Sequence, residues 1–207
     1  MRPRASRSIE NEVRKLGFAH VAGVDEVGRG CLAGPVVAAA VILPADRYIA
    51  GVADSKVLTA ADRERLFECI GDGAITWAVS VVDSVEIDRI NIHQASFQAM
   101  RLAVMALQPL PGFVLVDGFR IPSLTIAQRP VIGGDRRSRA IAAASILAKV
   151  MRDRLMVQLH DRDPRYGFNH HKGYATREHL DAVSRFGYSD AHRRTFRPPT
   201  LFDTILD

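Results

Sequence analysis

Apolar residues recur along the chain with two periods, one typical of strands and one typical of helices. Short apolar runs bounded by Gly, Pro and charged residues predict strands at residues 20–26, 36–43, 74–82, 113–116 and 124–128. Amphipathic or alanine-rich segments predict helices at residues 8–16, 59–70, 84–107 (restarting at Asn91), 138–160 and 176–186. Because strands alternate with helices, we expect an α/β fold in which a mixed sheet is flanked by helices.

The connection between the first two predicted strands is a short glycine-rich turn at residues 28–35. A turn this short favours an antiparallel hairpin, since parallel strands need a crossover of roughly a dozen residues. No repeat or linker divides the sequence. We therefore expect residues 1–207 to form one domain, with a polar N-terminal extension at 1–18 and a helical or looped C-terminal part from about residue 160.

The composition excludes several classes of protein. With 47% hydrophobic and 25% charged residues over 207 positions, the chain is neither disordered nor collagen-like. The longest apolar run, residues 36–43, is far shorter than the roughly 20 residues that cross a bilayer, and no apolar stretch precedes Val21 as in a secretory signal. Cys31 and Cys69 cannot form a disulfide framework, so we expect a cytoplasmic protein without a membrane partner.

Positive charge is concentrated in one quarter of the sequence. Residues 129–177 hold eleven Lys and Arg residues and four Asp residues, a net charge of +7, whereas the whole chain carries +5. A basic stretch of this kind is suited to bind phosphates, although a solvated helix face gives the same pattern. Lys149, on the longest predicted helix, is open to both interpretations.

Four acidic residues stand where apolar runs end: Asp25, Glu26, Asp117 and Asp135. Singly, each is explained as a turn former or a helix cap. Ligand sites of α/β proteins, however, usually assemble at strand ends. Two carboxylates roughly 4 Å apart repel by about 4 kcal/mol at an effective dielectric constant near 20, so a cluster of four needs protons or cations. Oxygen ligands alone select hard cations such as Mg²⁺ or Mn²⁺, which points to phosphoryl transfer or phosphodiester hydrolysis.

The local geometry sets a condition on this cluster. Neighbours on a regular strand point to opposite faces of a sheet, so Asp25 and Glu26 share a site only where the chain twists or bends. The following Gly28-Arg29-Gly30 makes a bend easy and opens the backbone to a sugar hydroxyl or a phosphate. A plain tight turn is the alternative interpretation of these glycines.

Other reactive or aromatic residues are better explained by packing or solvation. Trp77 has apolar neighbours on a predicted strand and is expected in the core. Cys31 has no His–acid pair to activate it and is expected to pack as a small residue. His170 and His171 lie in a polar stretch that we interpret as a solvated loop.

The string D-E-V-G-R-G at residues 25–30, followed by L-A-G-P at 32–35, resembles the signature of the ribonuclease HII family. The resemblance continues in the expected order and spans about residues 20–197. Its further motifs lie at residues 54–56, 116–118, 134–135, 142–149, 166–168, 171–176 and 192–196.

The resemblance implies a ribonuclease H-like fold with a mixed central sheet and a helical C-terminal part that binds substrate. Members of the family cut the RNA strand of RNA–DNA hybrids, and cut 5′ of ribonucleotides embedded in duplex DNA, leaving a 3′-hydroxyl and a 5′-phosphate. They need two Mg²⁺ or Mn²⁺ ions, and we expect a catalytic monomer that removes ribonucleotides and clears hybrids. Binding to a sliding clamp is conceivable, but residues 200–202 are too short a motif to support it.

The resemblance also implies roles for individual residues. The family's metal-binding and catalytic carboxylates match the four acids named above, and its substrate-binding residues match Gly28, Arg29 and Gly30 for the ribose 2′-hydroxyl, Lys56 for a phosphate, and Tyr174 for the nucleotide after the ribonucleotide. The chain departs from the family at Val57, where many members have a second lysine, and at Arg136 and Arg137, where serine and lysine are usual. A resolvase-like nuclease and a non-catalytic nucleic-acid-binding module are the two rival interpretations.

Overall fold

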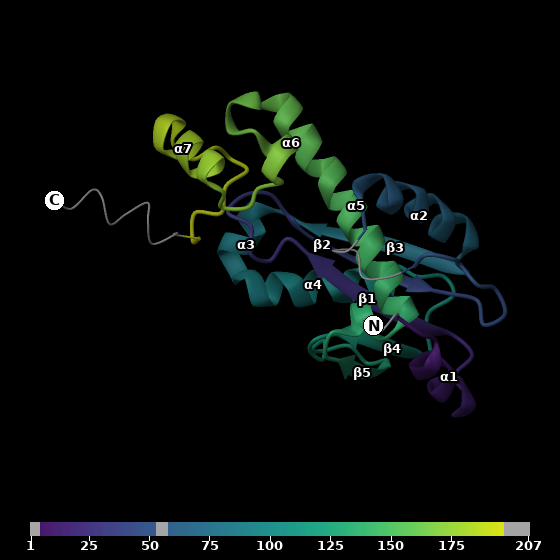
Figure 1. Cartoon of the computed structure of the whole chain (residues 1–207). Helices are drawn as coiled ribbons and strands as arrows, with labels where there is room; N and C mark the ends of the chain where they lie inside the picture. The colour runs from purple at the N-terminus through teal and green to yellow at the C-terminus, as the bar shows by residue number, and fades with distance from the viewer. Residues whose placement is uncertain (1–4, 53–57, 197–207) are drawn as a thin grey trace.

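The computed structural model describes residues 5–52 and 58–196, which form one mixed sheet with helices on both faces (Figure 1). The strands are β1 (Val21–Val27), β2 (Val36–Ile42), β3 (Thr76–Val82), β4 (Phe113–Asp117) and β5 (Ala127–Val131). The helices are α1 (Ser8–Lys15), α2 (Ala60–Gly73), α3 (Ser84–Ile90), α4 (Ile92–Met105), α5 (Arg139–Arg162), α6 (Phe168–His171) and α7 (Arg177–Phe186), with short 3₁₀ turns η2 (Gly134–Arg136) and η3 (Pro164–Tyr166).

The five strands lie in the order β3-β2-β1-β4-β5. β1 pairs antiparallel with β2, and β2 with β3, whereas β4 lies parallel to both β1 and β5. The hairpin predicted from the short glycine-rich turn and the mixed sheet are therefore confirmed. Since β1 and β4 run in parallel side by side, their carboxyl ends meet at one edge of the sheet.

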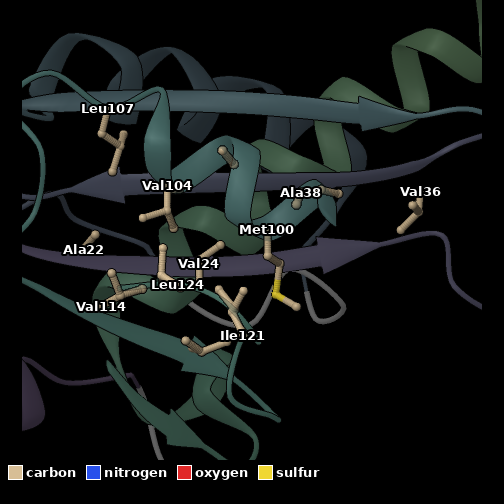
Figure 2. Packing of buried hydrophobic residues seen from close by; sticks show 14 of the residues in the cluster. Ala22, Val24, Val36, Ala38, Met100, Val104, Leu107, Val114, Ile121 and Leu124 are labelled. Carbon is tan, nitrogen blue, oxygen red and sulfur yellow. The ribbon is translucent and has the colours of Figure 1, made fainter. Parts of the chain in front are cut away.

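Alternate residues of β2 belong to two separate hydrophobic clusters, one on each face of the sheet. Ala38 and Ala40 face α4, where Figure 2 shows Met100 and Val104 against the strands. Ala39 lies on the opposite face, in the cluster formed with α2 and α5. Both faces of the central strands are therefore apolar, and this explains why residues 36–43 read as one continuous apolar run.

Small residues bring α5 very close to β1. A Cβ atom added to Gly23 would lie 2.2 Å from the carbonyl carbon of Ala140, so only glycine allows this approach. Ser138 begins the helix by accepting a hydrogen bond from the backbone N–H of Ile141. The close approach places Ser145, in the next turns of α5, above the end of β1, where its side chain hydrogen-bonds Asp25.

The C-terminal part packs around its own aromatic cluster and returns to the turn after β1 (Figure 1). The backbone of Leu32 donates to Gly173 at 2.8 Å, and that of Arg193 donates to Leu32 at 2.9 Å. Gly34 donates to Ala191 at 2.8 Å. Three segments far apart in the sequence, residues 28–35, 171–176 and 190–196, are thereby locked together.

Most predicted element boundaries are confirmed within a few residues, but one strand was misplaced. β5 begins three residues later than predicted because the Gln128 side chain bonds the backbone N–H and carbonyl of Ile121 and holds the preceding segment as a loop. Helix α3 begins after Asp83, whose side chain accepts a hydrogen bond from the Glu86 N–H. Within the described residues, no helix is both long and apolar enough to span a membrane.

Candidate active site

Three of the predicted acids line one cavity at the carboxyl ends of β1 and β4. Asp25 and Glu26 come from β1, and Asp117 is the last residue of the parallel strand β4. The cavity has a volume of about 490 Å³ and is lined by Asp25, Glu26, Val27, Arg63, Asp117, Ser145, Lys149 and Tyr174. Three of the four acids predicted at strand ends therefore lie in one cavity.

Asp25 and Glu26 share this cavity although they are neighbours on a strand. The pairing of β1 with β4 ends at Val24 and Val116, so the last residues of β1 have no strand beside them on that edge. The Glu26 N–H donates to Asp25 Oδ1 at 2.7 Å, which ties the two residues together. Both side chains thus line one cavity at the end of β1, where the strand is still paired with β2.

The carboxylates disfavour one another's charge. Burial, together with the nearby charges of Glu26 and Asp117, raises the pKa of Asp25 well above its usual value. Burial also raises the pKa of Glu26, opposed by the Arg29 guanidinium, which lies 3.1 Å from Glu26 Oε1. A cluster of this kind attracts a compensating cation.

The fourth acid, Asp135, is nearby but does not line the cavity. It is buried in η2, and the preceding Gly134 N–H donates to Asp117 Oδ1 at 2.6 Å. Within residues 5–52 and 58–196, no group of three or more His, Cys, Asp or Glu side chains is already arranged to hold a metal ion. The structure thus gathers three acids in one cavity and places the fourth next to Gly134, whose N–H bonds Asp117, without a finished metal-binding geometry.

The turn after β1 carries the three residues of the glycine-arginine-glycine motif. Gly28 has a φ of +96°, and a Cβ there would meet the Arg152 guanidinium at 2.2 Å. A Cβ on Gly30, in contrast, would meet nothing within 4 Å. The Arg29 side chain donates to Glu26 and also bonds His93 Nδ1 at 3.0 Å. Packing therefore requires glycine at position 28 but not at position 30.

Tyr174 reaches the cavity from the C-terminal part and is 42% exposed. Its hydroxyl hydrogen-bonds the Cys31 side chain, and burial together with this thiol raises the pKa of the tyrosine. Its backbone carbonyl lies 2.9 Å from His179 Nδ1. The ring is thus held at the mouth of the acidic cavity, beside the glycine-rich turn.

Several residues at the site were missed or left open by sequence reasoning. Lys149 lines the cavity, and its ammonium group lies 2.7 Å from Asp153, which also pairs with Arg63 at 3.9 Å. Arg152 and Arg193 are completely buried behind the turn. The basic stretch suggested Lys149, but no local pattern signals a buried arginine in a run of surface charges.

The minor candidates gave mixed results. Trp77 packs edge-to-face on Phe67 but is only partly buried, at the margin of the core, and Cys31 is a buried free thiol. His170 is exposed and pairs with Glu178. His171 is buried, so the prediction of a solvated loop was wrong for this residue. The ring is withdrawn from water because it stacks on a second buried histidine and bonds the backbone of its own segment.

Two sets of predicted residues lie outside the described part of the chain. Lys56, with the rest of its motif at residues 54–56 and the departure at Val57, belongs to the first set. The C-terminal residues 200–202 form the second.

Comparison with known proteins bears on the whole chain. The sequence model of a family described as Ribonuclease HII matches residues 22–198. A ribonuclease HII from Geobacillus thermodenitrificans is 52% identical over 189 residues, which cover 91% of this chain and 73% of the relative. The ribonuclease H2 of Pyrococcus horikoshii matches with a TM-score of 0.73 at 26% identity, over 86% of this chain and 94% of that structure. The ribonuclease HII of Archaeoglobus fulgidus, solved as a complex with PCNA, matches with a TM-score of 0.73 at 25% identity, over 89% and 99%.

These matches agree with the fold and with the order of the motifs. The two solved structures superpose on most of this chain, whose mixed five-stranded sheet and helical C-terminal part therefore have the ribonuclease H-like architecture that the resemblance implied. The family match begins within β1 and continues past α7, so it includes both the acidic cavity and the segments that surround it. The chain belongs to the ribonuclease HII family of endonucleases.

Proposed function

We propose that this chain cuts the RNA strand of RNA–DNA hybrids, and cuts 5′ of single ribonucleotides embedded in duplex DNA, leaving a 3′-hydroxyl and a 5′-phosphate. Family membership supports ribonuclease H activity on hybrids. The observation that carries the finer proposal is the shared cavity, in which three carboxylates and Tyr174 lie beside an open glycine turn. We extend the proposal to a monomer of one catalytic domain that works in the cytoplasm.

The chemistry of the donor set fits two Mg²⁺ or Mn²⁺ ions. Asp25 and Asp117 would hold one ion, and Asp25, Glu26 and Asp135 the other, because clustered oxygen donors without His or Cys prefer hard cations. When bound, such ions supply a lowered pKa for an attacking water and positive charge at the leaving 3′-oxygen. Burial, with the neighbouring charges of Glu26 and Asp117, raises the pKa of Asp25, and a bound cation would relieve this cost.

The chain's own residues hold and read the nucleic acid. Lys149 and Arg63 line the cavity and supply positive charge for a phosphate. The 2′-hydroxyl is the group that distinguishes a ribonucleotide from a deoxynucleotide, and backbone N–H groups of the turn at Gly28–Gly30 are suited to bind it. Tyr174 packs against the next sugar.

The test uses a DNA duplex that carries one ribonucleotide, incubated with and without Mg²⁺. We expect a single cut 5′ of the ribonucleotide that requires the ion. Asp25→Asn and Asp117→Asn should abolish turnover and retain binding of the hybrid. More than about a tenth of the wild-type rate in either variant would refute their role, since a tenfold loss is only about 1.4 kcal/mol of barrier.

The same assay separates the rival functions. A resolvase-like nuclease would cut without regard to the ribonucleotide, and a binding module would retain the duplex without cutting. Arg185→Gln is a matched control variant, because Arg185 lies on α7 and does not line the cavity. This variant should cut at the wild-type rate.

A further inference from the structure

Two arginines behind the glycine turn are buried as charges without a carboxylate partner in the described chain. Arg152 and Arg193 are both 0% exposed. Arg152 donates to the carbonyls of Ala33, Pro35 and Lys172. Burying a guanidinium costs several kcal/mol unless its donors are satisfied, so this arrangement needs an explanation.

The Arg193 side chain directs all the hydrogen bonds that it donates at the turn of residues 28–35. Its Nη2 donates to the Gly28 carbonyl at 2.6 Å and its Nη1 to the Arg29 carbonyl at 2.9 Å. Its Nε and Nη2 also donate to the Gly34 carbonyl, at 2.9 and 2.8 Å. Burial lowers the pKa of Arg193 to about 10, so the side chain still carries its charge at neutral pH.

These bonds orient two peptide groups. In a trans peptide, the carbonyl of one residue and the N–H of the next point in opposite directions. Because the carbonyls of Gly28 and Arg29 both point at Arg193, the N–H groups of Arg29 and Gly30 both point away from it. In the described part of the chain, neither N–H takes part in the backbone hydrogen bonds of the turn. Two successive outward N–H groups form a donor site for an oxygen atom.

The space around the turn agrees with this orientation. On the inner side, a Cβ on Gly28 would collide with Arg152. A Cβ on Gly30 would meet no protein atom within 4 Å, although Gly30 has no positive φ that requires glycine. Neither packing nor backbone strain explains Gly30, whereas an approaching ligand does.

We propose that Arg193 is the positioning residue that aims the Arg29 and Gly30 N–H groups at the ribose 2′-hydroxyl. The inference rests on the proposed function and deepens it, because it assigns ribonucleotide discrimination to a residue that does not touch the substrate. The buried charge also polarises both peptide groups, which strengthens their N–H groups as donors. Lysine would keep the charge, but its donors lie on a single nitrogen, whereas Arg193 uses three nitrogens for the Gly28, Arg29 and Gly34 carbonyls.

The experiment compares binding to two duplexes that differ only in one 2′-hydroxyl. Fluorescence anisotropy is measured with the full chain carrying Asp25→Asn, which prevents cutting. We expect Arg193→Lys to lower the ratio of ribonucleotide to all-DNA affinity about tenfold, equivalent to about 1.4 kcal/mol. An unchanged ratio in folded Arg193→Lys would overturn the inference. If the Asp25→Asn protein with Arg193 intact binds the two duplexes equally well, the proposed function itself is refuted, independently of Arg193.

Arg152→Lys is the matched control. It removes an equally buried arginine, but the N–H groups paired with its acceptors are used inside the protein: that of Gly34 bonds Ala191, and that of Gly173 bonds His171. Arg152→Lys should therefore lower the stability of the protein but leave the ratio of ribonucleotide to all-DNA affinity unchanged. If both variants lower the affinity ratio equally, the effect comes from general disorder of the turn, and the role of Arg193 is refuted.

A measurement on the Asp25→Asn protein alone covers the case in which Arg193→Lys does not fold. Amide hydrogen exchange at Arg29 and Gly30 should be fast in the free protein, because both N–H groups face water. The ribonucleotide duplex should slow it, and the all-DNA duplex should slow it less. Strong protection of both amides in the free protein would contradict the outward orientation.

Discussion

The pH dependence of stability provides a sharp test of the buried histidines behind Tyr174. His179 and His192 are both almost fully buried, and their Nε2 atoms lie 3.0 Å apart. The Ser189 N–H donates to His192 Nδ1 at 3.0 Å, so His192 carries its proton on Nε2 and donates it to His179. His179 in turn donates from Nδ1 to the Tyr174 carbonyl. The chain of bonds requires both rings to be neutral.

The sign and size of the effect follow from the shifted pKa values. Burial lowers the pKa of each histidine to about 4, from 6.5 in the unfolded chain. The unfolded chain therefore takes up protons first on acidification, and stability is lost as the pH falls from about 6.5 towards 4. For one histidine with these values, the loss between pH 7 and pH 5 is about 2 kcal/mol.

His192→Gln isolates this contribution. A glutamine amide can still donate to His179 but does not titrate, so the free energy of unfolding of the variant should fall by about 2 kcal/mol less than that of the wild type between pH 7 and pH 5. Urea unfolding at several pH values measures the difference, in which the opposing contribution of the buried acids cancels. His170→Gln is the control, because it removes an exposed histidine that lies outside the buried pair. Equal pH dependence in wild type and His192→Gln would refute the neutral buried pair.

Four further predictions concern the substrate surface and the packing of α5 on β1. Tyr174→Ala should reduce kcat/KM most at a ribonucleotide–deoxynucleotide junction. Tyr174→Phe should retain the packing and lose only a hydrogen bond. Equal losses of kcat/KM on the junction and on a continuous hybrid, at unchanged melting temperature, would contradict junction reading. Residues 129–177 are expected to contribute about four phosphate contacts. The affinity of the inactive Asp117→Asn protein for hybrid should then fall about 100-fold between roughly 50 and 200 mM salt. A flat salt profile would show that the basic stretch is only solvated. Gly30→Ala should leave thermal stability unchanged and impair ribonucleotide cleavage, since its Cβ would enter open space. Gly23→Ala should cost about 3 kcal/mol by urea unfolding, because its Cβ would strike the α5 backbone, and wild-type stability would refute that contact.

The acidic cavity was predictable because strands and their ends leave a local signal. Apolar runs that stop at Asp25 and Asp117 mark strand ends, and a glycine-rich turn marks a hairpin. Thr176 and Ser138 were likewise predictable as helix starts, since their side chains bond backbone groups three residues along the chain. Each of these signals depends on residues close together in the sequence.

The sequence by itself thus determined the order of elements, the strand-end acids and the family, because periodicity, capping and ordered motifs are all local properties. Only the tertiary structure showed that Asp135 does not line the cavity and that the neighbouring Gly134 N–H bonds Asp117. Only it revealed that Arg193 bonds the Gly28 and Arg29 carbonyls, and that His192 bonds His179, which bonds the Tyr174 carbonyl. The physical reason is that a buried polar side chain is defined by partners far away in the chain, and no pattern of neighbouring residues records them.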